Sequence, residues 1–68
     1  YEVLREVLRS ARAYETPTFR VLAAQPVIDR LLDEDSAQVS DLELFIERTI
    51  EFRVESVYSQ EQFDIIPV

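Results

Sequence analysis

A chain of 68 residues has room for one small hydrophobic core. A domain of this size buries only about 60% of the surface that its unfolded chain exposes, so its stability is marginal unless another surface adds to the core. Nearly half of the residues, 47%, are nevertheless apolar. We therefore expect residues 1–68 to form a single domain, a fragment of a larger chain, that packs against another protein surface.

Three residue types that carry much of enzyme chemistry are missing, because the sequence contains no Cys, no His and no Gly. Without thiolates and imidazoles, disulfides, zinc sites of Cys and His, and Ser-His-Asp triads are excluded. Without Gly, the phosphate-binding loops GxGxxG and GxxxxGKS/T are excluded as well. No apolar run approaches the roughly 18 residues of a membrane span, so we expect a cytoplasmic protein without membrane contact.

The charge balance is strongly acidic, with 14 acidic residues against seven basic ones and a formal net charge of -7. A chain with this charge repels polyanions. Autonomous, non-specific binding of nucleic acid is therefore not expected.

The first half of the chain is expected to form a helix, a strand and a second helix. Apolar residues recur at helical spacing between residues 1 and 14, and Pro17 ends that helix. Residues 18–24 favour β structure and are apolar on both faces, which predicts an internal strand. The second helix is expected to begin at Pro26 and to end before the acidic run 33–36.

A capping box is the sharpest local signal of the second half. Ser40 can accept from the backbone N–H of Glu43, while the Glu43 side chain reaches back to Ser40. Val39 and Leu44 flank this pair at the spacing of a hydrophobic staple. The third helix is therefore predicted to start at Ser40 and to run to about Arg48.

Two strands are expected to follow. Apolar and charged residues alternate over 50–54, and 63–66 form a last strand whose ladder Pro67 limits. The element order α-β-α-α-β-β predicts an α+β fold, with three helices on one face of a small three-stranded, mostly antiparallel sheet.

Arginines along one edge of the first helix are candidate contacts for RNA phosphates or for an acidic partner. They are Arg5, Arg9 and Arg12. Glu2 and Glu6 sit beside them at i,i+3 spacing, so solvated ion pairing is the favoured interpretation of this edge.

Aromatic side chains offer stacking faces for bases, but most of them occur at core-periodic positions. Phe19, Phe45, Phe52 and Phe63 are therefore predicted to lie in the core. Tyr58, in the turn before the last strand, is the aromatic residue left as a candidate contact.

Four carboxylates gather near the end of the second helix, at Asp29, Asp33, Glu34 and Asp35. Hard cations such as Mg²⁺ take oxygen ligands, but this cluster has no second ligand-bearing segment and no Gly turn. We expect a solvated acidic helix end, with no catalytic, cofactor-binding or metal-binding residue in the chain.

The C-terminal third resembles a known family. The segments that carry the resemblance are 41–46, 50–54 and 55–66, with 1–6 and 26–32 upstream, and the stretch 58–64 is the most specific of them. Together they resemble the C-terminal small domain of the bacterial ribonuclease E/G family. One departure is Glu47-Arg48, where a Gly would be expected to end the third helix.

The resemblance implies a parent protein that is a magnesium-dependent, single-strand-preferring endoribonuclease (a hydrolase) of RNA decay and RNA processing, ribosomal RNA included. Its catalytic Mg²⁺ site and the Zn²⁺ link between its subunits are implied to lie upstream, and no position of this chain matches those motifs. The piece itself is implied to be a structural domain for oligomerisation. Its expected partners are the rest of the parent chain and a second subunit, with RNA bound through the parent.

From the first strand onward, the element order also resembles a KH domain, which suggests an auxiliary RNA-binding module as the alternative function. A KH domain grips RNA through a GxxG loop between its central helices. Residues 33–38 occupy that place here and contain no Gly. An acidic loop repels RNA, so the topology can match a KH domain while the function is absent.

Overall fold

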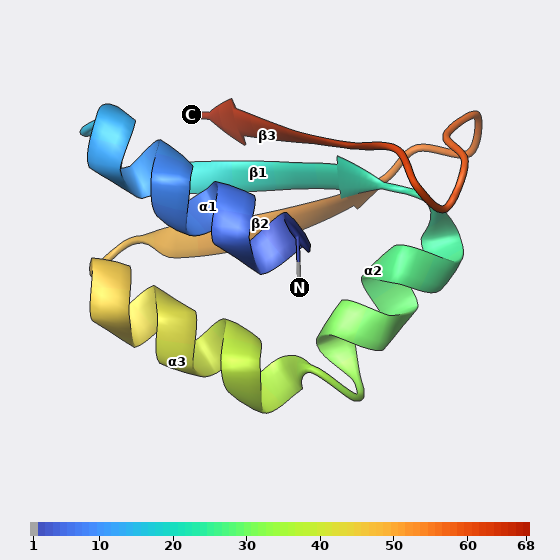
Figure 1. Ribbon diagram of the computed structural model, residues 1–68, viewed down its shortest axis with the longest axis horizontal. Coiled ribbons are helices and arrows are strands. Elements are labelled where there is room, and N and C mark those ends of the chain that lie inside the picture. The colour runs from blue at the N-terminus through green and yellow to red at the C-terminus, as the bar shows by residue number, and fades with distance from the viewer. Residues whose placement is uncertain (1) are drawn as a thin grey trace.

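The computed structural model describes residues 2–68, which form three helices and three strands (Figure 1). In chain order they are α1 (Glu2–Ala13), β1 (Thr18–Ala23), α2 (Gln25–Leu32), α3 (Ser36–Ile46), β2 (Thr49–Val54) and β3 (Phe63–Pro67). The α+β class and the order α-β-α-α-β-β are confirmed.

The sheet is mixed, with the strand order β2-β1-β3. β1 pairs with β2 in parallel and with β3 in antiparallel orientation, so the expected mostly antiparallel sheet is corrected for one of the two strand pairs. The parallel pair arises because α2 and α3 together form a crossover that returns the chain to the end of the sheet where β1 began. The prediction of an internal strand at residues 18–24 is confirmed, since β1 lies between the other two strands.

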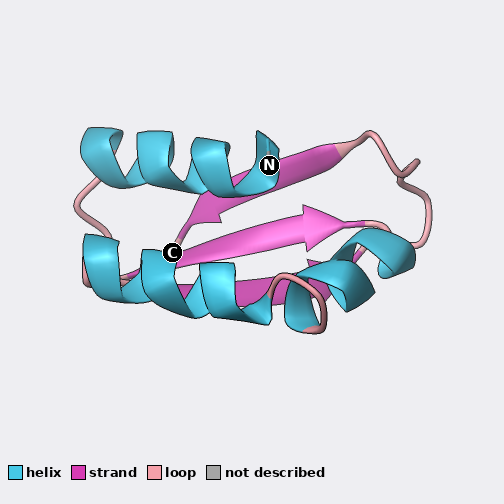
Figure 2. Ribbon diagram, turned by 60° about the horizontal axis from the view of Figure 1, so that its bottom comes forward, coloured by secondary structure: helices cyan, strands magenta, loops and turns pink. Residues whose placement is uncertain are grey.

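All three helices cover one face of the sheet (Figure 2). β1 alternates accordingly: Phe19, Val21 and Ala23 are completely buried beneath the helices, while the residues between them are half-buried. The open face carries an ion pair across the parallel strands, in which Arg20 Nη2 lies 3.2 Å from Glu51 Oε1. The hydrophobic core therefore lies between this face of the sheet and the inner sides of the helices.

α3 begins four residues before the predicted capping box. It starts at Ser36 with Asp35 as its N-cap residue, and Ser40 lies inside the helix. The predicted capping box is therefore wrong. The backbone N–H groups that it would have capped lie inside the helix, where carbonyl groups of the preceding turn already accept their hydrogen bonds. The Glu43 carboxylate instead accepts a 2.8 Å hydrogen bond from the backbone N–H of Ile50, which ties α3 to β2.

The end of α3 is made by a residue that is not Gly. Glu47 adopts the left-handed conformation with φ 58°, and its N–H donates to the carbonyl of Glu43 at 2.9 Å. A left-handed residue is the usual stop signal of a helix, but a side chain with a Cβ adopts it at a cost of about 1–2 kcal/mol. The chain therefore has a helix stop at Glu47 even without the Gly that the family pattern suggested.

Glu47→Gly is expected to stabilise the fold by about 0.5–1 kcal/mol. Relief of the left-handed strain is partly offset by the larger backbone entropy of Gly in the unfolded state, about 0.4–1 kcal/mol. Urea denaturation followed by circular dichroism measures the change. Glu47→Ala is the matched control: it removes the same carboxylate but keeps the Cβ, so a gain from this variant as large as that from Gly would contradict the strain argument.

Arg48, the next residue, fastens the far end of α1 to the core. Its Nη1 donates hydrogen bonds to the carbonyl oxygens of Ala11 at 3.1 Å and Tyr14 at 2.9 Å. Its guanidinium carbon also lies 5.8 Å from the centre of the Phe19 ring. A cation at this place satisfies carbonyls that the end of a helix leaves unpaired and complements the helix dipole.

Candidate functional site

The three arginines of α1 are exposed, as their positions on the helix predict. Arg9 pairs with Glu6, with 3.2 Å between Nη1 and Oε1. Within residues 2–68 no ion pair joins Glu2 to Arg5. The structure thus leaves this edge open to solvent and shows one of the two expected helical ion pairs.

Tyr58 lies in the loop between β2 and β3, half-buried, and its hydroxyl donates a 2.5 Å hydrogen bond to Asp64 Oδ2. This bond, together with the charges of Asp64 and Glu55, raises the pKa of Tyr58. The loop lies at the opposite end of the molecule from the C-terminal end of α1 (Figure 1). Arg12 and Tyr58 are therefore not brought together into one contact surface.

Alkaline titration is expected to show that Tyr58 ionises above its ordinary pKa of 10.0. The folded chain holds the Tyr58 proton more tightly than the unfolded chain does. The contribution of the protonated Tyr58 to the stability of the fold is therefore complete below pH 10, and it is lost as the pH rises through the raised pKa. Phenolate absorbance follows the ionisation. Asp64→Asn should bring the Tyr58 pKa back toward its ordinary value and Glu55→Gln should lower it less. An unchanged titration in Asp64→Asn would refute the assignment.

The acidic turn 33–35 connects α2 and α3. Asp33 and Glu34 are exposed, but Asp35 is only 3% exposed, which corrects the expectation of a wholly solvated cluster. The carboxylate of Asp35 lies 3.7 Å from Arg30 Nε, and the Asp35 N–H donates to the Arg30 carbonyl at 3.0 Å, so its buried polar groups have partners. Within residues 2–68, no group of three or more carboxylates is placed to hold a metal ion.

An apolar groove lies between α1 and α3. Its walls are Leu4 and Leu8 from α1 and Leu42 and Phe45 from α3, and its volume is about 600 Å³. Arg5, Gln38 and Asp41 complete the lining. These seven residues are called the α1/α3 groove below.

The groove explains an error in the predicted core. Phe19 is buried, and Phe52 and Phe63 pack against the core as expected, but Phe45 is 73% exposed. Leu44 is 78% exposed as well, so the predicted staple with Val39 is wrong. Both residues face outward because α3 turns Val39 toward the core. The sequence does show apolar residues at helical spacing, at Leu4 and Leu8 and at Leu42 and Phe45. This spacing does not reveal that the two helices lie side by side and form a groove.

No helix within residues 2–68 has the length and apolar character needed to cross a membrane. No protein-family profile matches this chain, and no solved structure matches it.

Curated proteins do match along nearly the whole chain. The chain is 36% identical to Ribonuclease G of Salmonella typhimurium and 35% identical to Ribonuclease G of Escherichia coli K12, in both cases over 66 residues. It is 33% identical to Ribonuclease G of Haemophilus influenzae over 67 residues. Each match covers 97% of this chain but only 14% of the relative, so the chain spans about one seventh of the length of these relatives.

Proposed function

This chain is related to ribonuclease G, of the ribonuclease E/G family, along 97% of its length, and on that premise we propose that it is the C-terminal structural and assembly domain of a ribonuclease G-like enzyme. The parent would be a cytoplasmic endoribonuclease that cuts single-stranded RNA in RNA processing and decay. The bond-breaking groups and the Mg²⁺ and Zn²⁺ sites of such a parent would lie outside these 68 residues. The piece itself would contribute a packing surface and no catalytic residue.

The observation that carries this proposal is the exposed apolar surface of the helices. Phe45 and Leu44 are mostly exposed to solvent, although a domain with so small a core would be stabilised by burying them. Leu4 and Leu8 are only half-buried in the α1/α3 groove. Burial of apolar surface is worth about 25 cal/mol per Å², so a second surface laid on this groove is favoured in water. A contiguous exposed apolar patch of this kind is typical of an interaction site.

Sedimentation of the chain over a range of concentrations tests the proposal. We expect association that increases with concentration and that Phe45→Glu abolishes, because a carboxylate in the groove opposes its burial. Val57→Glu is the matched control, since Val57 is 85% exposed in the loop between β2 and β3. A strictly monomeric chain that also fails to bind the rest of its parent would count against the assembly role.

Auxiliary RNA binding is the second candidate function, and the exposed arginine edge of α1 favours it. Titration with a single-stranded RNA at low and moderate salt distinguishes the two functions. RNA binding predicts an affinity that falls steeply with salt and is lost in the double variant Arg9→Ala, Arg12→Ala. The assembly role predicts weak RNA binding with no dependence on these two residues, as the net charge of -7 favours.

A further inference from the structure

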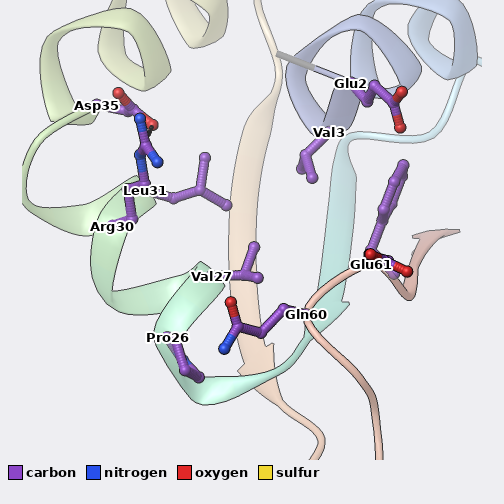
Figure 3. A pocket seen from close by; sticks show the side chains of 10 residues that line it. Glu2, Val3, Pro26, Val27, Arg30, Leu31, Asp35, Gln60 and Glu61 are labelled. Atoms are coloured by element: carbon purple, nitrogen blue, oxygen red, sulfur yellow. Dashed lines mark ion pairs between the residues drawn. The ribbon is translucent and has the colours of Figure 1, made fainter.

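A second cavity, of about 380 Å³, opens between the N-terminal end of α1 and α2 (Figure 3). It lies apart from the α1/α3 groove, with which it shares no lining residue. It is called the α1/α2 pocket here. Its lining residues are Glu2, Val3, Pro26, Val27, Arg30, Leu31, Asp35, Gln60, Glu61 and Phe63.

The pocket combines an apolar floor with a polar rim. Val3 and Leu31 are buried core residues, and Phe63 packs against the same core, so the floor is held in place by the fold itself. The volume is near the lower end of the range for ligand sites, about 300–1,000 Å³. A pocket of this size and polarity fits one or two side chains of a partner.

The rim is acidic. Glu2, Asp35 and Glu61 line the pocket with Arg30, and because Asp35 is only 3% exposed and lies against Arg30, the carboxylates at the rim are those of Glu2 and Glu61. On the α2 side, Arg30 Nε lies 3.7 Å from Asp35 and 3.5 Å from Glu34, so this cation is already opposed by carboxylates. Figure 3 shows Glu2 and Glu61, apart from each other, on the side of the pocket that faces away from Arg30 and Asp35.

The helix ends around the pocket contribute partial charges of both signs. α1 begins beside it, residues from both ends of α2 line it, and so does Asp35, the N-cap residue of α3. Within residues 2–68, no ion pair joins Glu2 or Glu61 to a cation. These two carboxylates attract cations and repel phosphates, while Arg5 and Arg9 lie on the far side of Glu2, in an adjoining hollow that shares Glu2 and Phe63 with the pocket.

We propose that the α1/α2 pocket binds a basic peptide segment of a partner protein, one that presents an apolar side chain next to an arginine or lysine. The apolar side chain enters over Val3, Leu31 and Phe63, where its burial supplies the affinity. The neighbouring cation pairs with Glu2 and Glu61, which supplies the selectivity. The partner is a protein and not RNA, because the phosphates of RNA meet like charge here.

Nuclear magnetic resonance of the isotope-labelled chain, titrated with N-acetyl-Leu-Arg-Leu-amide, tests the proposal. We expect shifts confined to the residues that line the pocket, with an affinity that weakens as salt is added. The matched peptide N-acetyl-Leu-Glu-Leu-amide should bind more weakly. Loss of two exposed ion pairs in the double variant Glu2→Gln, Glu61→Gln should reduce the affinity for the arginine peptide about threefold to tenfold.

Glu15→Gln is the control, because it removes an exposed carboxylate that does not line the pocket. Circular dichroism checks that each variant keeps its fold. Equal binding of the acidic and basic peptides, unchanged affinity in the double variant, or absence of shifts at the pocket would overturn the proposal. Two further results would overturn it. Shifts of the pocket resonances when the chain alone is diluted would assign the pocket to a second copy, and larger shifts with an RNA oligonucleotide than with the basic peptide would assign it to RNA.

Discussion

Replacing Phe19 with Ala is expected to leave most of the chain unfolded at room temperature. Phe19 is completely buried near one end of the central strand β1, where its Cα partners are Ile50 on one side and Pro67 on the other. Truncation of a buried Phe to Ala costs about 3–5 kcal/mol. A domain is stabilised by roughly 0.05–0.15 kcal/mol per residue, so this loss is comparable with the whole stability of so short a chain. Urea denaturation followed by circular dichroism measures it.

Phe45→Ala provides the control for that experiment. The same side chain is removed, but from a position that is 73% exposed. The expected loss is below about 0.5 kcal/mol, as for surface substitutions in general. Similar losses from the two variants would mean that the helices do not cover the face of the sheet to which Phe19 belongs.

Arg48→Ala is the second substitution with a large expected effect. It removes two charge-assisted hydrogen bonds, to the carbonyls of Ala11 and Tyr14, and the contact of the guanidinium with the Phe19 ring. Hydrogen bonds of a charged group are worth about 1.5–3 kcal/mol, and an exposed cation–π contact adds about 0.5–1 kcal/mol. Because the freed carbonyls regain some water, we expect a loss of about 2–3 kcal/mol, measured by urea or thermal denaturation.

Arg48→Lys should recover only part of this loss, since an ammonium can donate to both carbonyls but lacks the planar guanidinium that contacts the Phe19 ring. Arg53→Ala is the matched control: Arg53 is an exposed residue of β2, 3.8 Å from Glu55, and its loss should cost less than about 0.5 kcal/mol. If Arg48→Ala is as mild as the control, then Arg48 does not fasten α1.

Most of the elements could be predicted because their signals are local. Pro17 ends α1 as expected, and the β-favouring residues after it form β1. The alternation of 50–54 corresponds to β2, which also includes Thr49. The helix end is predicted less well: without a Gly at Glu47-Arg48 the sequence places the end of the third helix at about Arg48 or Thr49, whereas α3 ends at Ile46 with Glu47 as its left-handed cap.

The arrangement of the elements could not be predicted, because it depends on contacts between distant residues. The pairing of β1 with β3, which places β1 at the centre, leaves no local trace in the sequence. Ser40 and Glu43 fit a capping box, yet Glu43 bonds to Ile50, seven residues on, once β2 is in place. Both cavities lie between segments far apart in the chain, so the outward position of Phe45 and the acidic rim at Glu61 required the structure.

The central position of β1 determines when the sheet can form during synthesis of the chain. Thr18 pairs with Thr49 and Phe19 with Pro67, so neither edge of β1 is completed by a neighbouring hairpin. High contact order of this kind slows folding, and the sheet can close only after the residues of β3, Phe63–Pro67, have been synthesised. A truncated product that ends before Phe63 would present one bare edge of β1 to other chains and would be prone to aggregate.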